Sequence, residues 1–142
     1  MNKIIIESSS DEELRKLPEE VIINLDPPFT DERGSIQPLV DLPMESAVMI
    51  TSWKDTVRAN HYHKTDWHFC TVIKGRIRYH WRDHGSIQVP DSVIIEEGQT
   101  FFTPPMVDHA MEFLEDTTFL TLGRNSRKQE VYEADVVRIK LI

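Results

Sequence analysis

The sequence contains a single cysteine, Cys70, and no long apolar run. One cysteine excludes an internal disulfide, and no basic, apolar, small-residue signal peptide opens the chain, so we expect a cytoplasmic protein. The apolar run at residues 4–6 is far shorter than the roughly 20 residues that a membrane-spanning helix needs. We therefore expect no membrane segment.

Basic residues are also in the minority, because 16 Lys and Arg stand against 24 Asp and Glu and give a net charge of -8. This balance argues against a general affinity for nucleic acid or for an anionic membrane. Local basic clusters at residues 76–82 and 124–128 fit either a solvated surface or a pocket for an anionic ligand. We expect the partner to be a small-molecule substrate.

Short segments rich in β-branched and aromatic residues, separated by Gly, Pro, Asp and Asn, predict an all-β sandwich or barrel. The gaps between them are too short for the crossover helices of a parallel sheet. Ser10 and Glu13 form a capping-box pattern that predicts one short helix, which Pro18 ends. The predicted strands cover residues 21–25, 35–40, 47–51, 57–63, 68–73, 76–82, 92–95, 99–103, 110–114 and 117–122.

Two further strands are predicted near the ends of the chain, at residues 4–7 and in the tail at 131–142. We interpret residues 1–30 as an extension with a strand and a short helix, and residues 31–142 as a single domain. Terminal strands can pair across a dimer as well as within one chain. The sequence therefore indicates a homodimer.

Four of the six histidines fall where one β-architecture can bring them together. His61 and His63 are two residues apart in a predicted strand, so they point to the same face, together with Val57 and Ala59. Because Val57 and Ala59 are apolar, we expect this face to point into the interior of the barrel. His68 follows a short turn and brings a third imidazole back to the same region.

His109 begins a predicted strand whose inward face also carries Met111 and Phe113. Imidazoles that converge from neighbouring strands suit a divalent transition metal, and a shared metal removes the cost of burying them together. His80 and His84 flank a charged turn, and we expect both to face water. The predicted metal ligands are His61, His63, His68 and His109.

The spacing of these residues resembles the two motifs of the cupin superfamily, G-x5-H-x-H-x(3,4)-E-x6-G and G-x5-P-x-G-x2-H-x3-N. The residues that keep this spacing are His61, His63, His68 and Gly75 for the first motif and Gly98, Pro104, Met106, His109 and Phe113 for the second. Four motif positions hold another residue type: Asp55, His68, Met106 and Phe113 stand in place of Gly, Glu, Gly and Asn. The resemblance implies a cupin-type double-stranded β-helix, or jelly-roll barrel, holding Zn, Fe, Ni or Mn.

Two stretches resemble nucleotide-sugar enzymes within the cupins. RANHYHK at 58–64 is similar to R-G-x-H-A-H-K of 3,4-ketoisomerases and to R-G-x-H-Y-Q of 3,5-epimerases, which DERG at 31–34 also resembles. RGS at 33–35 resembles the cupin domain of capsular polysaccharide enzymes. These likenesses imply an isomerase or epimerase of a keto nucleotide sugar in surface polysaccharide biosynthesis, with His61 as its base.

Such a reaction removes a proton next to a carbonyl, so it needs a base and a group that stabilises the enediolate. His61 and His63 are the candidate bases, and Tyr79 is a candidate acid. Arg58 and Arg76 are candidate partners for the diphosphate of the substrate.

Two other functions stay open at this point. One is a metal-dependent dioxygenase, which an apolar pocket lined by Phe69, Phe101, Phe102 and Met111 would favour. The other is a non-catalytic binding module in which the metal only braces the barrel.

Overall fold

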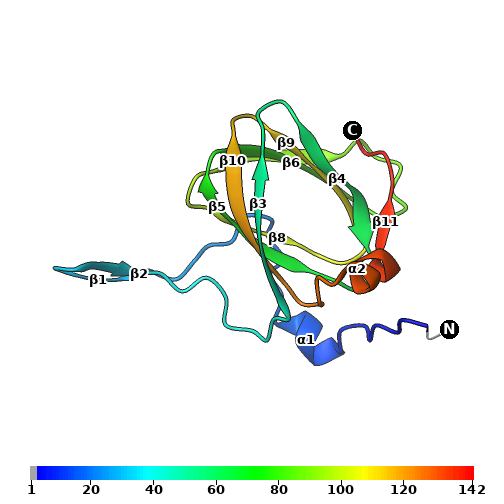
Figure 1. The fold of residues 1–142 in the computed structure, drawn as a ribbon, viewed down its shortest axis with the longest axis horizontal. Coiled ribbons are helices and arrows are strands. Elements are labelled where there is room, and N and C mark those ends of the chain that lie inside the picture. Colours follow the sequence, from blue (N-terminus) through cyan, green and yellow to red (C-terminus); the bar gives the residue numbers. More distant parts are fainter. Residues whose placement is uncertain (1–2) are drawn as a thin grey trace.

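A computed structural model describes residues 3–142, so the first two residues of the predicted extension lie outside it. Two antiparallel sheets face each other (Figure 1), one with strand order β3-β10-β5-β8 and the other with order β11-β4-β9-β6-β7. The all-β jelly-roll prediction is confirmed. The strands run over Phe29–Asp31 (β1), Gly34–Ile36 (β2), Ser46–Ser52 (β3), Val57–His63 (β4), His68–Lys74 (β5), Arg76–Asp83 (β6), Asp91–Glu96 (β7), Thr100–Thr103 (β8), Val107–Phe113 (β9), Thr117–Gly123 (β10) and Val136–Arg138 (β11).

The predicted N-terminal helix is present as α1, Asp11–Arg15. Its capping box forms as expected: the Glu13 N–H donates to Ser10 Oγ at 3.1 Å, and the Ser10 N–H donates to Glu13 Oε1 at 3.3 Å. Among the described residues, 3–142, no helix has the length and apolarity needed to cross a membrane.

The core lies between the two sheets and consists of their inward-facing side chains. Its fully buried members are Cys70, Val72, Ile77, Tyr79, Ile95, Phe101, Met111, Phe113 and Phe119. The chain passes from the four-stranded to the five-stranded sheet at Gly75, where φ is +110° and a Cβ would lie 2.3 Å from Thr117 Oγ1. Only glycine fits this turn.

The N-terminal segment covers the outer face of the four-stranded sheet. Phe69 and Phe102 point outward there and pack with Trp67 under apolar residues of the segment 17–44. The strand predicted at 21–25 is reduced to one β-bridge, between Ile22 and Phe101. The segment mainly packs over the sheet. Its apolar residues therefore show the pattern of a strand, although they form no full ladder of backbone hydrogen bonds.

The two terminal strands differ from their prediction. Residues 4–7 form no strand, and the tail forms a helix, α2 (Gln129–Asp135), before the short strand β11. Gln, Glu and Ala favour this helix, which brings Tyr132 and Asp135 to one side, since residues three apart are neighbours on a helix surface. A strand would have placed them on opposite faces.

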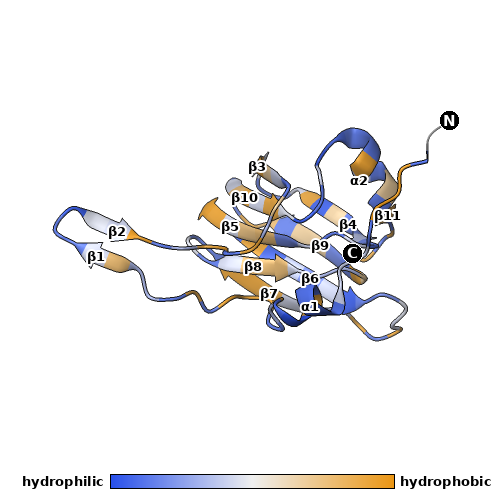
Figure 2. Cartoon of the chain, turned by 90° about the horizontal axis from the view of Figure 1, so that it is seen from below, coloured by the Kyte–Doolittle hydropathy of each residue, from blue (hydrophilic) through white to orange (hydrophobic). Residues whose placement is uncertain are grey.

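Strands β1 and β2 form a hairpin that stands clear of both sheets (Figures 1 and 2). The Arg33 N–H donates to Asp31 Oδ1 at 2.9 Å and stabilises the turn. The strand predicted at 35–40 ends at Ile36, because the chain then leaves the hairpin and runs back to the body of the molecule.

Candidate functional site

A cavity of about 330 Å³ opens between the two sheets, at the end of the barrel near α2. Both sheets contribute to its wall, and α2 closes one side. The polar side chains that line it are Ser46, Arg58, His61, His63, His68, Thr103, His109, Thr121, Arg127, Tyr132 and Arg138. Its size falls in the range of small-molecule sites.

A β-bulge in β4 decides which side chains face this cavity. Ala59 pairs with Ala110 and His61 pairs with His109, so Asn60 is an extra residue on β4. Paired residues of an antiparallel ladder share a face, which puts His61 beside the buried His109. Beyond the bulge the parity changes, and Arg58 shares the face of its partner Met111.

The prediction that Val57 and Ala59 share the face of His61 is therefore wrong, although both still contribute to the cavity wall. A bulge cannot be read from alternation, because it changes the alternation by one residue. Arg58 reaches across to β3, where its Nε donates to Ser52 Oγ at 2.6 Å and its Nη2 to the Thr51 carbonyl at 3.0 Å.

Three of the four predicted ligands converge in the cavity. The ring centroids of His61 lie 4.7 Å from those of both His63 and His109, and one ring nitrogen of each of the three lies within 4.8 Å of the others. The three side chains come from the adjacent strands β4 and β9. Three such nitrogens are a donor set that fits a divalent transition metal.

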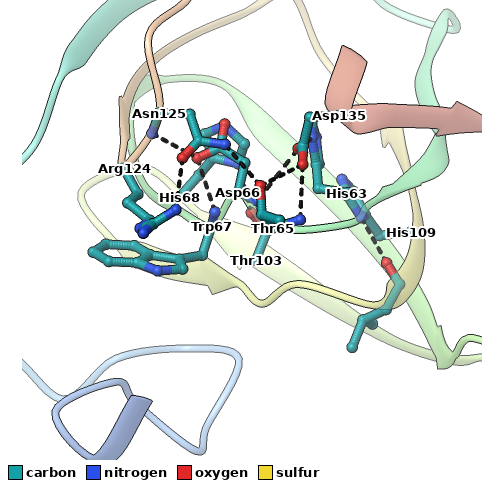
Figure 3. Close-up of polar contacts among 11 residues, drawn as sticks. His63, Thr65, Asp66, Trp67, His68, Thr103, His109, Arg124, Asn125 and Asp135 are labelled. Atoms are coloured by element: carbon teal, nitrogen blue, oxygen red, sulfur yellow. Dashed lines mark hydrogen bonds and ion pairs between the residues drawn. The ribbon is translucent and has the colours of Figure 1, made fainter. Parts of the chain in front are cut away.

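Hydrogen bonds fix the orientation of two of these rings (Figure 3). His63 Nδ1 lies 3.0 Å from Asp135 Oδ2, and His109 Nδ1 lies 3.1 Å from the carbonyl oxygen of Val107. Both partners are acceptors, so Nδ1 carries the proton in each ring and Nε2 keeps a lone pair. This arrangement suits a general base and a metal ligand equally.

His68 lies apart from this group of three. Its Nε2 is 3.0 Å from Asp66 Oδ2 and its Nδ1 is 3.1 Å from Thr103 Oγ1, so both ring nitrogens have partners within the protein. The ring still lies against His63, with centroids 4.9 Å apart. His68 is thus held in the wall of the cavity by Asp66 and Thr103.

His63, Asp66 and Asp135 form a second cluster of metal-ligating residue types. Here the carboxylates are already satisfied: Asp135 accepts from the backbone and hydroxyl of Thr65, and Asp66 accepts from the backbone N–H groups of Trp67 and Asn125. Figure 3 shows these bonds as one connected network. The cluster is a hydrogen-bonded support for His63 and His68.

Burial and neighbouring imidazoles keep His61, His63 and His109 neutral. Burial, followed by the charges of His109 and His63, lowers the pKa of His61 to about 2, and burial together with His63 lowers the pKa of His109 to about 3. Burial also lowers the pKa of His63, although Asp135 opposes the shift. Burial raises the pKa of Asp135, but hydrogen bonds from His63 and Thr65 outweigh it and bring it to about 2.

Tyr79, the predicted acid, does not line the cavity. Its side chain is 0% exposed in the core, its hydroxyl has no hydrogen-bond partner, and burial raises its pKa. Tyr132 does line the cavity, with its ring centroid 5.8 Å from that of His63 and 6.5 Å from that of His61. The guanidinium of Arg127 lies 3.6 Å over the Tyr132 ring.

The remaining predicted residues lie outside the cavity. Arg76 pairs with Glu96 on the surface, His80 is mostly buried against Glu112, and His84 stacks on Tyr62 at the outer face of the sheet. Of the predicted apolar pocket, only Met111 lines the cavity. Phe69 and Phe102 lie on the outer face of the sheet and Phe101 in the core, which removes the observation that favoured a dioxygenase.

Sequence reasoning missed Asp135, Tyr132 and Arg138, whereas Arg127 belongs to the basic cluster at 124–128 that was expected on a solvated surface or in an anion pocket. The segment QEVYEAD carries a helical signal in its Gln, Glu and Ala residues, and this signal predicts that Tyr132 and Asp135 share one face. The alternation of apolar residues further along the tail pointed to a strand instead. No local signal shows that this helix lies against β4.

The fold and the site define a jelly-roll protein whose interior cavity is lined by histidines. A sequence model of the cupin domain matches residues 49–122, more than half of the chain, and the protein therefore belongs to the cupin domain family. A search among curated proteins finds no match.

Solved structures of similar fold include nucleotide-sugar enzymes. A 3,4-ketoisomerase from Helicobacter canadensis is 19% identical with a TM-score of 0.67, over 82% of this chain and 88% of that one. The 3,4-ketoisomerase of Thermoanaerobacterium thermosaccharolyticum, as a double mutant with TDP, is 20% identical with a TM-score of 0.66, over 82% and 85%. A dTDP-4-dehydrorhamnose 3,5-epimerase from Sulfolobus tokodaii is 22% identical with a TM-score of 0.59, over 72% and 68%. At these identities the likeness concerns the fold alone.

Proposed function

We propose that the protein is an isomerase or epimerase that moves a proton at the carbon next to the carbonyl of a keto nucleotide sugar. One observation carries the proposal: a buried His63–Asp135 pair, with 3.0 Å between Nδ1 and Oδ2, stands in the wall of a cavity large enough for a sugar. The similarity in fold to ketoisomerases and epimerases adds support.

His63 is the general base in this proposal, in place of His61. Its Nε2 lone pair is available, and the Asp135 carboxylate stabilises the imidazolium that forms when the ring accepts a proton. His61 has no carboxylate partner among the described residues, and its pKa of about 2 makes it a weak base. The side chain of His63 is only 3% exposed, so bulk water competes poorly for the transferred proton.

Three arginines of the cavity wall are candidate ligands for the diphosphate. Arg58, Arg127 and Arg138 all line the cavity, although the chain as a whole has a net charge of -8. Guanidinium groups bind phosphate oxygens in bidentate geometry. A diphosphate bound by these arginines would hold the attached sugar in the cavity that the histidines line.

Tyr132 is the proposed acid. Burial raises the pKa of its phenol, and the charge of Arg127 only partly offsets this, so the hydroxyl is protonated at neutral pH. It lies on the side of the cavity where His61 and His63 meet α2. A phenol in this place donates its proton to an enediolate oxygen.

The test is deuterium exchange into TDP-4-keto-6-deoxyglucose in D₂O, followed by NMR. We expect the wild-type protein to incorporate deuterium beside the carbonyl. His63→Asn and Asp135→Asn should slow exchange about 100-fold or more, the usual contribution of a positioned general base.

Tyr79→Phe is the matched control. It removes a buried hydroxyl that has no hydrogen-bond partner, so exchange should continue at the wild-type rate. Absence of exchange with the wild-type protein, with or without added metal, would refute the proposal. So would a His63→Asn variant that exchanges as fast as wild type.

We further propose that His61, His63 and His109 can hold one divalent transition metal. The converging nitrogens and the hydrogen bonds that orient His63 and His109 support this donor set. A bound metal would supply a Lewis acid for negative charge on a substrate oxygen, or a redox centre if it is iron. It would occupy the lone pair that His63 needs as a base, so the exchange assay is run on metal-loaded and metal-free protein.

Elemental analysis of protein purified without an affinity tag tests this donor set. His109→Ala should lose the metal, whereas His68→Ala should keep it, because both nitrogens of His68 already have protein partners. Equal loss of metal from both variants would support a ligand set of four histidines. Iron together with oxygen uptake would favour the dioxygenase over the isomerase.

We also propose that the protein is a homodimer. The hairpin of β1 and β2 supports this, because its exposed Phe29 and Ile36 have no cover within the described chain.

A further inference from the structure

We infer that Asn60 is a positioning residue, which holds the β-bulge that turns both His61 and Arg58 into the cavity. The effect of Asn60 on catalysis rests on the proposed function, but its effect on the bulge can be tested without any substrate.

The bulge is held in an unfavourable backbone conformation. Ala59 and Asn60 are consecutive residues with φ of 68° and 53°. Asparagine tolerates this left-handed region, whereas the Cβ of alanine makes it sterically unfavourable. The resembling R-G-x-H stretches have glycine where Ala59 stands, so in this chain other contacts must maintain the bulge.

Asn60 makes these contacts with the tail. Its carbonyl oxygen accepts the Ile139 N–H at 2.9 Å, and its side-chain Oδ1 accepts the N–H groups of Leu141 at 3.0 Å and Ile142 at 3.2 Å. Strand β11 pairs with β4 only as far as Arg138 and His61. The Asn60 side chain therefore extends the ladder past the point where the bulge interrupts it.

The consequence for the site follows from strand parity. If β4 ran as a regular strand without the bulge, His61 and Arg58 would be three residues apart on it and would point to opposite faces. Only the bulged strand gives the cavity both a histidine beside His109 and an arginine beside Met111. Asn60 lies in the wall of the barrel and touches neither group itself, so it acts through the backbone.

Three variants separate positioning from general stability. Asn60→Gly keeps access to positive φ but removes the acceptor, whereas Asn60→Asp keeps both. Leu141→Pro removes one donor N–H without changing Asn60. Lys140→Pro is the matched control, since the Lys140 N–H has no backbone partner among the loop hydrogen bonds of residues 3–142.

The structural readout is the NOE between the ring protons of His61 and His109, whose centroids lie 4.7 Å apart. We expect this NOE in the wild type, in Asn60→Asp and in Lys140→Pro, and its loss in Asn60→Gly and Leu141→Pro. The rate of deuterium exchange into the sugar should fall at least about tenfold in the same two variants, with KM changed less than kcat.

A lower melting temperature with an unchanged NOE in Asn60→Gly and Leu141→Pro would overturn the inference, because it would show a merely structural role. If Asn60→Gly does not fold, Leu141→Pro and Lys140→Pro still decide the question. Loss of the NOE in both proline variants alike would also contradict the inference. Since the NOE needs no substrate, failure of the proposed reaction leaves this test intact.

Discussion

At the scale of single residues, His61 and His109 are unusual because burial keeps both imidazoles neutral. Burial lowers the pKa of His61 to about 2 and that of His109 to about 3, from 6.5 in a free chain. Between these values and pH 6.5 the unfolded chain binds protons that the folded protein does not. The contribution of these neutral histidines to the free energy of unfolding is therefore complete above about pH 6.5 and is lost as the pH falls toward 3.

We expect the free energy of unfolding, measured with urea in the presence of EDTA, to decrease from pH 7.5 to pH 5. Two such histidines give a slope of roughly 2 kcal/mol per pH unit below pH 6. His109→Gln should remove about half of this slope, because glutamine does not titrate. Equal unfolding free energies at pH 7.5 and pH 5 would contradict the burial of neutral imidazoles.

At the scale of elements, the sequence predicts the regular strands well and the irregular ones poorly. Alternation, β-branched and aromatic residues and the turn residues between them locate β3 to β10. The motif spacing also brings His61, His63 and His109 together correctly. These features depend on the spacing of residues along the chain, which can be read directly from the sequence.

The features that failed depend on tertiary contacts. The bulge at Asn60 reverses parity and exchanges Arg58 for Ala59 on the cavity face, and only the pairing of β4 with β9 shows it. Helix α2 brings Tyr132 and Asp135 to the site because the tail folds back against β4.

At the scale of the whole molecule, the basis for expecting a homodimer has changed. The predicted strand at 4–7 is absent and β11 pairs within the chain, so neither terminal strand is available to a partner in the way the sequence suggested. The hairpin of β1 and β2 offers a different surface. An isolated two-stranded hairpin is marginally stable in water, and this one pairs Phe29, 62% exposed, with Ile36, 66% exposed.

We expect a second copy of the chain to cover this hairpin, because burying the adjacent Phe29 and Ile36 side chains removes apolar surface from water and stabilises the arm. Light scattering during gel filtration should give twice the chain mass of 16.6 kDa. Replacing both residues by serine should return the mass to that of the monomer. Ile87→Ser is the matched control, since Ile87 is 98% exposed in the loop between β6 and β7 and lies outside the hairpin. A wild-type monomer, or a doubly substituted protein that stays dimeric, would exclude the hairpin as the contact.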